Sequence, residues 1–323
     1  MSGGLPGKHE GVRSMAVLKW LETIRTPWMD GVMSILTQLG DETLFMILGM
    51  TVLWCFHKVW GFRFMLIGLT GTAMNQLLKA IFLVKRPWLI DPTLTIVESA
   101  REGATGYSFP SGHTQSAVSC FGTLAVWLGR RSVKVLCAAL ILIVAFSRMY
   151  LGVHTPLDVG VSLVTGVLTV WLMTWLLQKD SPKARLAACS VGIAMTLALL
   201  AYVHLAPARE ANVAEFDAHG MKAAWQLVGA MAGMMLAWWT DEKYLHFETK
   251  AVWWAQICKV ALGLALVLAV RLGMKPVLSA IFGEGMFTHG IRYFLMTVAG
   301  GILWPMTFRY WSRIGQKNRE VSA

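Results

Sequence analysis

The amino-acid sequence predicts an all-α protein, a polytopic bundle of helices that cross a membrane. Of its 323 residues, 56% are hydrophobic and only 15% are charged, whereas soluble domains carry roughly 25% charged residues. The mean hydropathy is +0.55. Several apolar runs reach the length of about 18 residues that marks a spanning helix. These observations exclude a soluble domain and indicate a multi-pass protein of the cell membrane.

About nine apolar segments are expected to span the membrane. Asp41 stands where the first of them opens, and we expect its side chain to cap that helix; a role in the site is the alternative. Many of the 15 tryptophans lie near the ends of apolar runs, as in the aromatic belts of membrane proteins. The predicted spans are residues 41–57, 62–83, 113–128, 135–150, 156–178, 186–206, 220–240, 251–272 and 291–308.

An amphipathic helix is predicted before these spans, over residues 15–26. Its apolar side chains recur at helical spacing, with Lys19, Glu22 and Arg25 between them. This segment is too polar to cross a bilayer and is typical of a helix that lies in the membrane interface. The apolar segment that follows, residues 28–39, is short and is expected to dip into the membrane.

The net charge of +11 does not indicate nucleic acid as a partner. The basic residues lie in short loops between apolar runs, where they anchor a protein to anionic lipid and set its orientation. The five cysteines fall inside apolar runs, and no CxxC pair occurs. We therefore expect buried thiols and no metal site.

Three polar signatures interrupt the apolar sequence, and the first is the segment from Lys79 to Pro87. Lys79 and Arg86 are seven residues apart, about two helical turns, so we expect them to share one face near the end of the second span. Pro87 disfavours helix for the residue before it. Alone, this pattern is more typical of cations that reach to the membrane interface than of a binding site.

The second signature is Pro110-Ser111-Gly112-His113, which directly precedes a predicted helix. Ser111 is expected to be the N-cap, and Gly112 lets the backbone approach a ligand. A helix N-terminus with free N–H groups is also an anion site. Ordinary helix capping explains the same residues.

The third signature runs from Ser147-Arg148 to His154 and Asp158. Pro156 is expected at the first position of the fifth spanning helix, which puts Asp158 in its first turn and His154 just before it. Asp158 can then hold one ring nitrogen of His154 and leave the other as an unprotonated nucleophile. Asp158 can instead form a capping box with Thr155, and the two roles are compatible.

Taken together, the three signatures predict an anion site. All fall at span ends on one side of the membrane if the spans alternate, and charged groups near a bilayer are costly unless they pair or function. Lys79, Arg86 and Arg148 supply three cations, and a phosphoryl group is the natural partner for such a cluster.

The signatures resemble the tripartite motif of the type 2 phosphatidic acid phosphatase superfamily: Lys-x6-Arg-Pro, Pro-Ser-Gly-His and Ser-Arg-x5-His-x3-Asp. Every fixed position is present, and the resemblance covers about residues 62–178. The family includes lipid phosphate, undecaprenyl diphosphate and sphingosine phosphate phosphatases, glucose-6-phosphatase and soluble vanadium haloperoxidases. The expected nine spans are more similar to glucose-6-phosphatase than to the six-span bacterial lipid phosphatases.

The resemblance implies a role for each motif residue. His154 attacks phosphorus and becomes a phosphohistidine, Asp158 orients its ring, and His113 protonates the leaving oxygen and then activates water. No metal or other cofactor is implied, because fixed cations take its place. The phosphate-binding groups would be Lys79, Arg86, Ser111, the backbone N–H of Gly112, and Arg148.

On this basis we divide the chain into three parts. Residues 1–61 hold the interfacial helix and the first span, 62–178 the phosphatase core, and 179–323 the accessory membrane helices and a basic tail. The expected substrate is a lipid phosphate or diphosphate, such as phosphatidate, an isoprenoid diphosphate or a sphingoid phosphate. The sequence does not indicate an oligomeric state.

Other functions remain open at this stage. The same phosphohistidine suits a phosphotransferase that uses an acceptor other than water, and the span count also suits a sugar-phosphate phosphatase. A transporter or binding protein is disfavoured, because binding alone needs no nucleophile. A haloperoxidase is disfavoured because the site lies between membrane spans.

Loop charges predict the side of the membrane that the site faces. Basic turns near residues 58–63, 130–134 and 179–185 fall on one side, which marks the cytoplasm. The loop 84–112 and the turn 151–155 fall on the other. The site is therefore expected to face away from the cytoplasm.

Three polar residues outside the motifs have less specific expectations. Asp217 is expected in a solvated loop and His219 at the interface. Lys259 falls inside the eighth predicted span, where it indicates either a polar groove or a wrong boundary.

Overall fold

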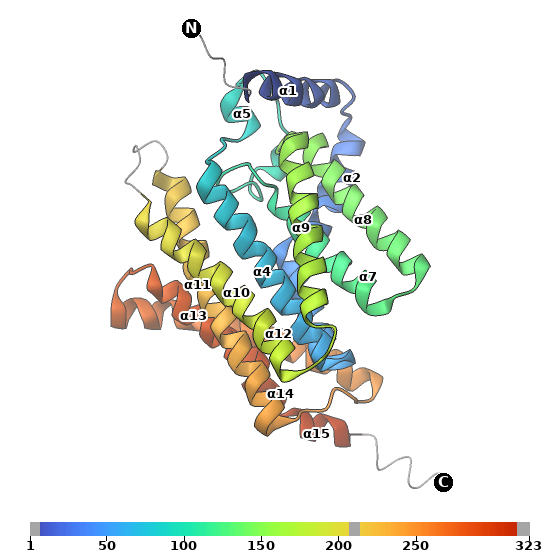
Figure 1. Ribbon diagram of the computed structural model, residues 1–323, viewed down its shortest axis with the longest axis vertical. Coiled ribbons are helices and arrows are strands. Elements are labelled where there is room, and N and C mark those ends of the chain that lie inside the picture. Colours follow the sequence, from blue (N-terminus) through green and yellow to red (C-terminus); the bar gives the residue numbers. More distant parts are fainter. Residues whose placement is uncertain (1–6, 207–213, 315–323) are drawn as a thin grey trace. The chain divides into compact units, whose positions relative to one another are not determined.

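The computed structural model describes residues 7–206 and 214–314, and every regular element within them is a helix (Figure 1). The predicted all-α class is therefore confirmed. The predicted basic tail beyond residue 314 lies outside the described residues. Two compact units make up the chain. The first contains Met74–Thr174, Ala206–Gly220 and the residues up to Leu44, and the second contains Phe45–Ala73, Trp175–Leu205 and the residues from Met221.

The helices of the first half alternate long elements with short turns. They are α1 (Gly7–Thr23), α2 (Pro27–Leu36), η1 (Thr37–Gly40), α3 (Glu42–Thr51), η2 (Val52–Phe56), α4 (Lys58–Phe82), α5 (Pro87–Ile90), η3 (Glu98–Ala100), α6 (Gly112–Ala117), η4 (Val118–Gly122), α7 (Thr123–Leu128), α8 (Arg131–Tyr150) and α9 (Pro156–Leu176).

The helices of the second half belong mostly to the second unit. They are α10 (Pro182–Leu205), α11 (Ala214–Thr240), η6 (Asp241–Leu245), α12 (Trp253–Phe282), α13 (Phe287–Val298), η7 (Ala299–Leu303), α14 (Trp304–Met306) and α15 (Phe308–Arg313).

Helices occupy all nine predicted spanning segments, but fewer have the length and hydropathy to cross a membrane alone. Within the described residues five do so, and a sixth arises if two helices bent by 49° form one broken span. That pair joins Pro27–Gly40 to Glu42–Phe56, and Asp41 caps the second helix through the Thr43 N–H at 2.8 Å. The count of nine stays a prediction. The five are Lys58–Ile90, Arg131–Tyr150, Pro156–Leu176, Pro182–Leu205 and Trp253–Phe282.

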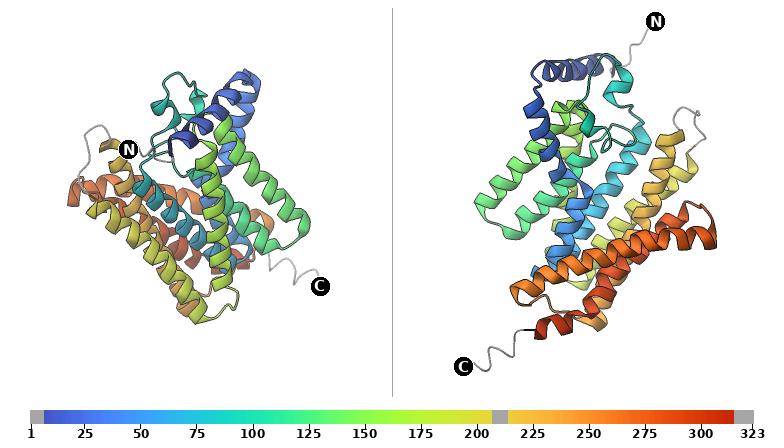
Figure 2. Two further views of the ribbon diagram at one scale, coloured as in Figure 1. Left: turned by 45° about the horizontal axis from the view of Figure 1, so that its top comes forward. Right: turned by 180° about the vertical axis from the view of Figure 1, so that it is seen from behind.

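In the first unit, η1 and α8 pack against α6. A Cβ on Gly40 would lie only 2.5 Å from the carbonyl oxygen of His113, so η1 meets the backbone of α6 directly. Helices α7 and α8 form a hairpin whose turn contains Gly129 at φ +66° (Figures 1 and 2). These contacts fix the segments that carry His113 and Arg148.

Helix α1 lies against the end of α8 and the loop that follows α5 (Figure 1). Leu18 and Leu21 are buried with Leu94, whereas Trp20 is 61% exposed. Beyond the helix, Arg25 donates to the carbonyl of Tyr150 at 2.8 Å and of Thr95 at 2.7 Å. The segment expected in the membrane interface thus also packs on the protein, and its interfacial position stays a prediction.

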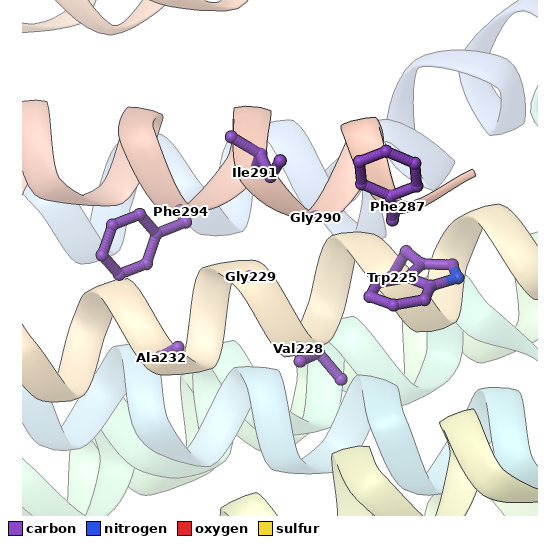
Figure 3. A pocket seen from close by; sticks show the side chains of 8 residues that line it. All are labelled: Trp225, Val228, Gly229, Ala232, Phe287, Gly290, Ile291 and Phe294. Atoms are coloured by element: carbon purple, nitrogen blue, oxygen red, sulfur yellow. The ribbon is translucent and has the colours of Figure 1, made fainter. Parts of the chain in front are cut away.

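In the second unit, the π turn η2 and the helices α11 to α15 build a core around Trp54. The Trp54 indole donates to the carbonyl of Gly300 at 2.9 Å, and Phe62 stacks on Trp238 with ring centroids 5.3 Å apart. An apolar groove of about 450 Å³ runs between α11 and α13, with Trp225 and Phe294 among its lining residues (Figure 3). None of the predicted site residues lines this groove.

Replacing Gly152 with alanine should destabilise the turn between α8 and α9. Gly152 has φ +81°, a left-handed conformation that costs other residues about 1–2 kcal/mol, and a Cβ would lie 2.7 Å from Arg25 Nη2. We expect Gly152→Ala to lower the Tm of the protein in detergent by about 2–6 °C. Gly160→Ala in α9 is the control, because nothing lies within 4 Å of its Cβ position and alanine favours helix. Equal Tm values for the two variants would contradict this reading of the turn.

Candidate active site

Lys79 and Arg86 approach the site from different elements. Lys79 is in the last turn of α4, but α4 ends at Phe82, and Leu83 takes φ +56°. The expectation that both cations share one helix face is therefore wrong. The cause is tertiary: the carbonyl of Val84 accepts a hydrogen bond from the Ser108 N–H at 2.8 Å, which draws the chain out of the helix. Arg86 reaches the site from extended backbone, as the residue before α5.

Both cations are buried and donate to backbone carbonyls of the loop before α6. Lys79 Nζ lies 2.5 Å from the carbonyl oxygen of Tyr107. Arg86 donates to Thr105 O at 2.7 Å and to Gly106 O at 3.1 Å. Because carbonyls carry no full negative charge, the cations are held without being neutralised.

Ser111 caps α6, as expected from the sequence. Its hydroxyl accepts from the Thr114 N–H at 3.4 Å and from the Thr114 hydroxyl at 3.0 Å. Asn75 and Ser162 donate to the Ser111 carbonyl at 3.4 and 2.9 Å. At Gly112, a Cβ would meet only Asn75 Oδ1 among the described atoms, at 3.9 Å. This leaves room beside the first backbone N–H groups of α6.

The side chain of His113 points toward the long loop. A Cβ on Gly103 would lie 3.6 Å from His113 Cε1 and 3.7 Å from Nε2. The backbone of His113 is fixed from the other side by Gly40. His113 therefore sits between η1 and the loop that holds Lys79 and Arg86.

Arg148 in the last turn of α8 has hydrogen-bond donors that the protein does not use. Its side chain is 1% exposed, and Nη1 donates to the Thr37 hydroxyl at 2.9 Å. The Nε and Nη2 atoms are buried and make no hydrogen bond with any described residue. An unpaired buried donor costs about 1–3 kcal/mol, more when it is charged. A bound anion would recover that cost.

Asp158 both caps α9 and lies beside His154. Its Oδ2 accepts from the Thr155 N–H at 2.8 Å, and the Thr155 hydroxyl accepts from the Asp158 N–H at 3.2 Å. The same Oδ2 lies 3.4 Å from His154 Nδ1 and accepts from the Ser108 hydroxyl at 2.6 Å. The two roles that the sequence left open thus occur together, and Pro156 begins α9 as expected.

The surroundings of His154 determine where its proton lies. Arg86 Nη1, which can only donate, is 2.8 Å from His154 Nε2, so Nε2 is an acceptor and Nδ1 carries the proton that faces Asp158. Burial first, and then the charges of Arg86, Arg148 and Lys79, hold the pKa of His154 well below its usual value. At neutral pH His154 is therefore neutral, and its Nε2 lone pair is unprotonated and accepts from Arg86.

The eight residues that the sequence singled out all lie in the first unit. Lys79, Arg86, Arg148 and His113 all act electrostatically on His154. Three further polar residues support them and were not predicted. For two of them the only signal is position: Asn75 lies one turn before Lys79, and Ser108 lies two residues before Pro110. The three are Thr37, Asn75 and Ser108, which are 2%, 1% and 0% exposed.

Two family models match the chain. Residues 44–182 match the PAP2 superfamily, and residues 225–316 match the PAP2 superfamily phosphatase, transmembrane extension. Together they take in well over half of the chain. The chain belongs to the PAP2 superfamily. All eight predicted site residues lie in the first matched region, so the resemblance seen in the motifs is confirmed at the level of the family.

Several bacterial proteins are similar to this PAP2 chain. Phosphatidylglycerophosphatase B of Bacillus subtilis is 29% identical over 172 residues, which are 49% of this chain and 80% of that protein. Undecaprenyl-diphosphatase BcrC of the same species is 26% identical over 148 residues, 45% of this chain and 72% of that protein. Phosphatidylglycerophosphatase B of Escherichia coli is 39% identical over 82 residues, 23% and 31% respectively. No solved structure shows a significant match.

Removing the charge of Arg148 should raise the pKa of His154. The Arg148 cation disfavours the imidazolium form, so Arg148→Met should shift the titration of His154 to higher pH while it stays below the ordinary value of about 6.5 in the unchanged protein. NMR of histidine-labelled protein measures this directly, with His154→Ala identifying the signal. Arg131→Gln, which removes an exposed cation from the first turn of α8, should leave the titration in place. A titration that is unchanged or lower in Arg148→Met would contradict the geometry.

Proposed function

We propose that this chain is an integral membrane phosphatase that hydrolyses a phosphate monoester or diphosphate of a lipid through a phosphohistidine on His154. One observation carries the proposal. Within one buried cluster, Arg148 has two unused donors, and His154 has an unprotonated Nε2 with Asp158 beside its Nδ1. The first suits a phosphoryl group, and the second suits a nucleophile that attacks it.

In the first step, His154 Nε2 attacks phosphorus and the bond to the leaving oxygen breaks. His113 takes up a proton as the anionic substrate binds, because the phosphate charge offsets the nearby cations, and it gives that proton to the leaving oxygen. Arg86 Nη1 moves from Nε2 to a phosphoryl oxygen, and the unused N–H groups of Arg148 bind the other oxygens together with Lys79. Asp158 stabilises the positive charge that develops on the His154 ring. Such donors, fixed before the reaction, stabilise the charge of the transition state.

In the second step, water replaces His154 on phosphorus. His113, now neutral, takes a proton from the water as it attacks, and inorganic phosphate leaves with neutral His154 restored. In both steps the Ser111 hydroxyl and the backbone N–H of Gly112 donate hydrogen bonds to the phosphoryl oxygens. We propose that neither step needs a metal ion, because three fixed cations and the α6 N-terminus supply the positive potential.

We propose a lipid substrate because the site belongs to a membrane-spanning chain and because of the similar proteins. Their names contain a glycerolipid phosphate and an isoprenoid diphosphate. Phosphatidate and sphingoid phosphates are phosphate monoesters of lipids, like the glycerolipid phosphate.

A release assay in chelator should show hydrolysis of at least one lipid phosphate, and faster hydrolysis than of glucose 6-phosphate. The panel contains phosphatidylglycerophosphate, phosphatidate, undecaprenyl diphosphate, a sphingoid phosphate and glucose 6-phosphate, all in matched detergent. Preference for the sugar phosphate would contradict the lipid proposal, and activity that requires added magnesium would contradict metal independence. An added alcohol that captures the phosphoryl group would indicate a phosphotransferase.

His154→Ala should abolish turnover, because no nucleophile remains. His113→Ala should retain slow phosphorylation of p-nitrophenyl phosphate, whose leaving oxygen needs no proton, and should accumulate phosphoprotein because water activation is lost. Phosphoprotein trapped in acid-free gels from labelled substrate measures both effects. His57→Ala, at an exposed position after η2, is the control and should match the unchanged protein. Substantial turnover by His154→Ala would exclude this nucleophile.

We propose further that the site faces away from the cytoplasm, with nine spans and an interfacial α1. Single cysteines at Glu102 and Ser132, both exposed, test this in a background that lacks the five native cysteines. An impermeant thiol reagent added to intact cells should label Glu102→Cys and spare Ser132→Cys, because basic turns such as that at Ser132 stay inside. If only Ser132→Cys were labelled, the site would face the cytoplasm and the proposed orientation would be wrong.

A further inference from the structure

Two residues outside the three signatures, Asp217 and His219, contact the loop that holds the site cations. They lie between the two regions that the family models match and within the first unit. The expectation of a solvated loop for Asp217 is wrong, whereas an interfacial position for His219 stays a prediction. Helix α11 begins at Ala214, before the predicted start at residue 220, and carries both residues in its first turns.

Each residue contacts a different part of the loop. Asp217 Oδ1 accepts a hydrogen bond from the Tyr107 hydroxyl at 3.2 Å, and Tyr107 is 5% exposed. The His219 ring lies against Gly106, where a Cβ would be 3.0 Å from His219 Cδ2. Gly106 also has φ +64°, a conformation that favours glycine, and a Cβ there would press against the His219 ring.

The same two loop residues hold the catalytic cations through their carbonyls. Tyr107 O accepts from Lys79 Nζ at 2.5 Å, and Gly106 O accepts from Arg86 Nε at 3.1 Å. Tyr107 and Gly106 therefore form a bridge, with α11 on one side and the phosphate-binding cations on the other. A displacement of this bridge moves Lys79 and Arg86 together.

We propose that Asp217 and His219 are positioning residues: they fix the Gly106–Tyr107 segment and so place Lys79 and Arg86 for phosphate binding. This inference rests on the proposed phosphatase function. It assigns a role to α11, which continues into the transmembrane extension that begins at residue 225. Neither residue contacts the phosphate, so the effect on the reaction is indirect.

The variants Tyr107→Phe and Asp217→Ala test the hydrogen bond, and His219→Ala tests the contact with Gly106. A misplacement of about 1 Å at such cations can cost up to about a hundredfold in rate, so we expect kcat/KM to fall by about tenfold or more. The affinity for vanadate should fall in parallel, because vanadate needs the same cations. Asp217→Asn, whose amide oxygen still accepts from Tyr107, should retain most activity. The double variant Tyr107→Phe/Asp217→Ala should lose no more activity than the less active of the two single variants, because both substitutions remove the same hydrogen bond.

Hydrogen–deuterium exchange of residues 103–109 provides a readout that does not depend on activity. Exchange there should accelerate in Tyr107→Phe, Asp217→Ala and His219→Ala, and should not change in the control Tyr310→Phe, whose ring is 71% exposed in α15. If the unchanged protein hydrolyses no phosphate ester, the proposed function fails, and the exchange still decides whether α11 fixes the loop. Unchanged exchange, or a double variant whose loss equals the product of the two single losses, would overturn the proposal.

Discussion

Three buried cations in one unit must be stabilised without being neutralised, and the first unit is organised around this constraint. Lys79, Arg86 and Arg148 are 7%, 3% and 1% exposed. Carboxylate partners would offset the cost of burial but would also cancel the attraction for an anion. The chain instead supplies carbonyl and hydroxyl oxygens, whose dipoles hold the cations and leave the positive charge in place. Of the nitrogen atoms of these three cations, only Nε and Nη2 of Arg148 find no such partner among the described residues. The carboxylate of Asp158 is directed to His154 by Ser108 and Thr155.

This solution requires a long irregular segment, because carbonyls inside helices are already used. The loop between α5 and α6 provides them at Thr105, Gly106 and Tyr107, and the turn after α8 provides Val153 O, which lies 3.2 Å from Arg86 Nη1. Irregular backbone beside a site needs support from outside. Helix α1 and Arg25 hold the end of α8, and α11 holds the loop. Elements outside the three signatures thus help to hold the proposed phosphate site in place.

Local chemistry predicted the motif residues and their caps. Ser111, Pro156 and the Asp158–Thr155 pair are readable because capping depends on neighbours within three residues. The second predicted span, to residue 83, ends close to the end of α4 at Phe82. The turn that carries Arg86 off this helix was not readable, since Leu83 adopts a conformation unfavourable for leucine that a hydrogen bond from Ser108, 24 residues from Val84, makes possible. Thr37, Asn75 and Asp217 were missed for the same reason. Each is an ordinary polar residue whose partner comes from a distant segment, and only the folded chain shows the contact.

Lys259 shows why a buried cation is not by itself a site. It lies inside α12, is 0% exposed, and donates to Trp54 O at 2.7 Å and Thr249 O at 2.9 Å, with the Phe308 ring centroid 4.0 Å away. Helix α12 continues well past this position, to Phe282, so Lys259 does not mark a helix end. Its charge is satisfied by carbonyls and a ring. Lys79 is held in the same way by Tyr107 O. What distinguishes the first unit is the combination around Lys79: an arginine with donors that no described residue uses, and a histidine whose Nε2 is unprotonated. The chemistry depends on that combination, and the carbonyl contacts only make it stable.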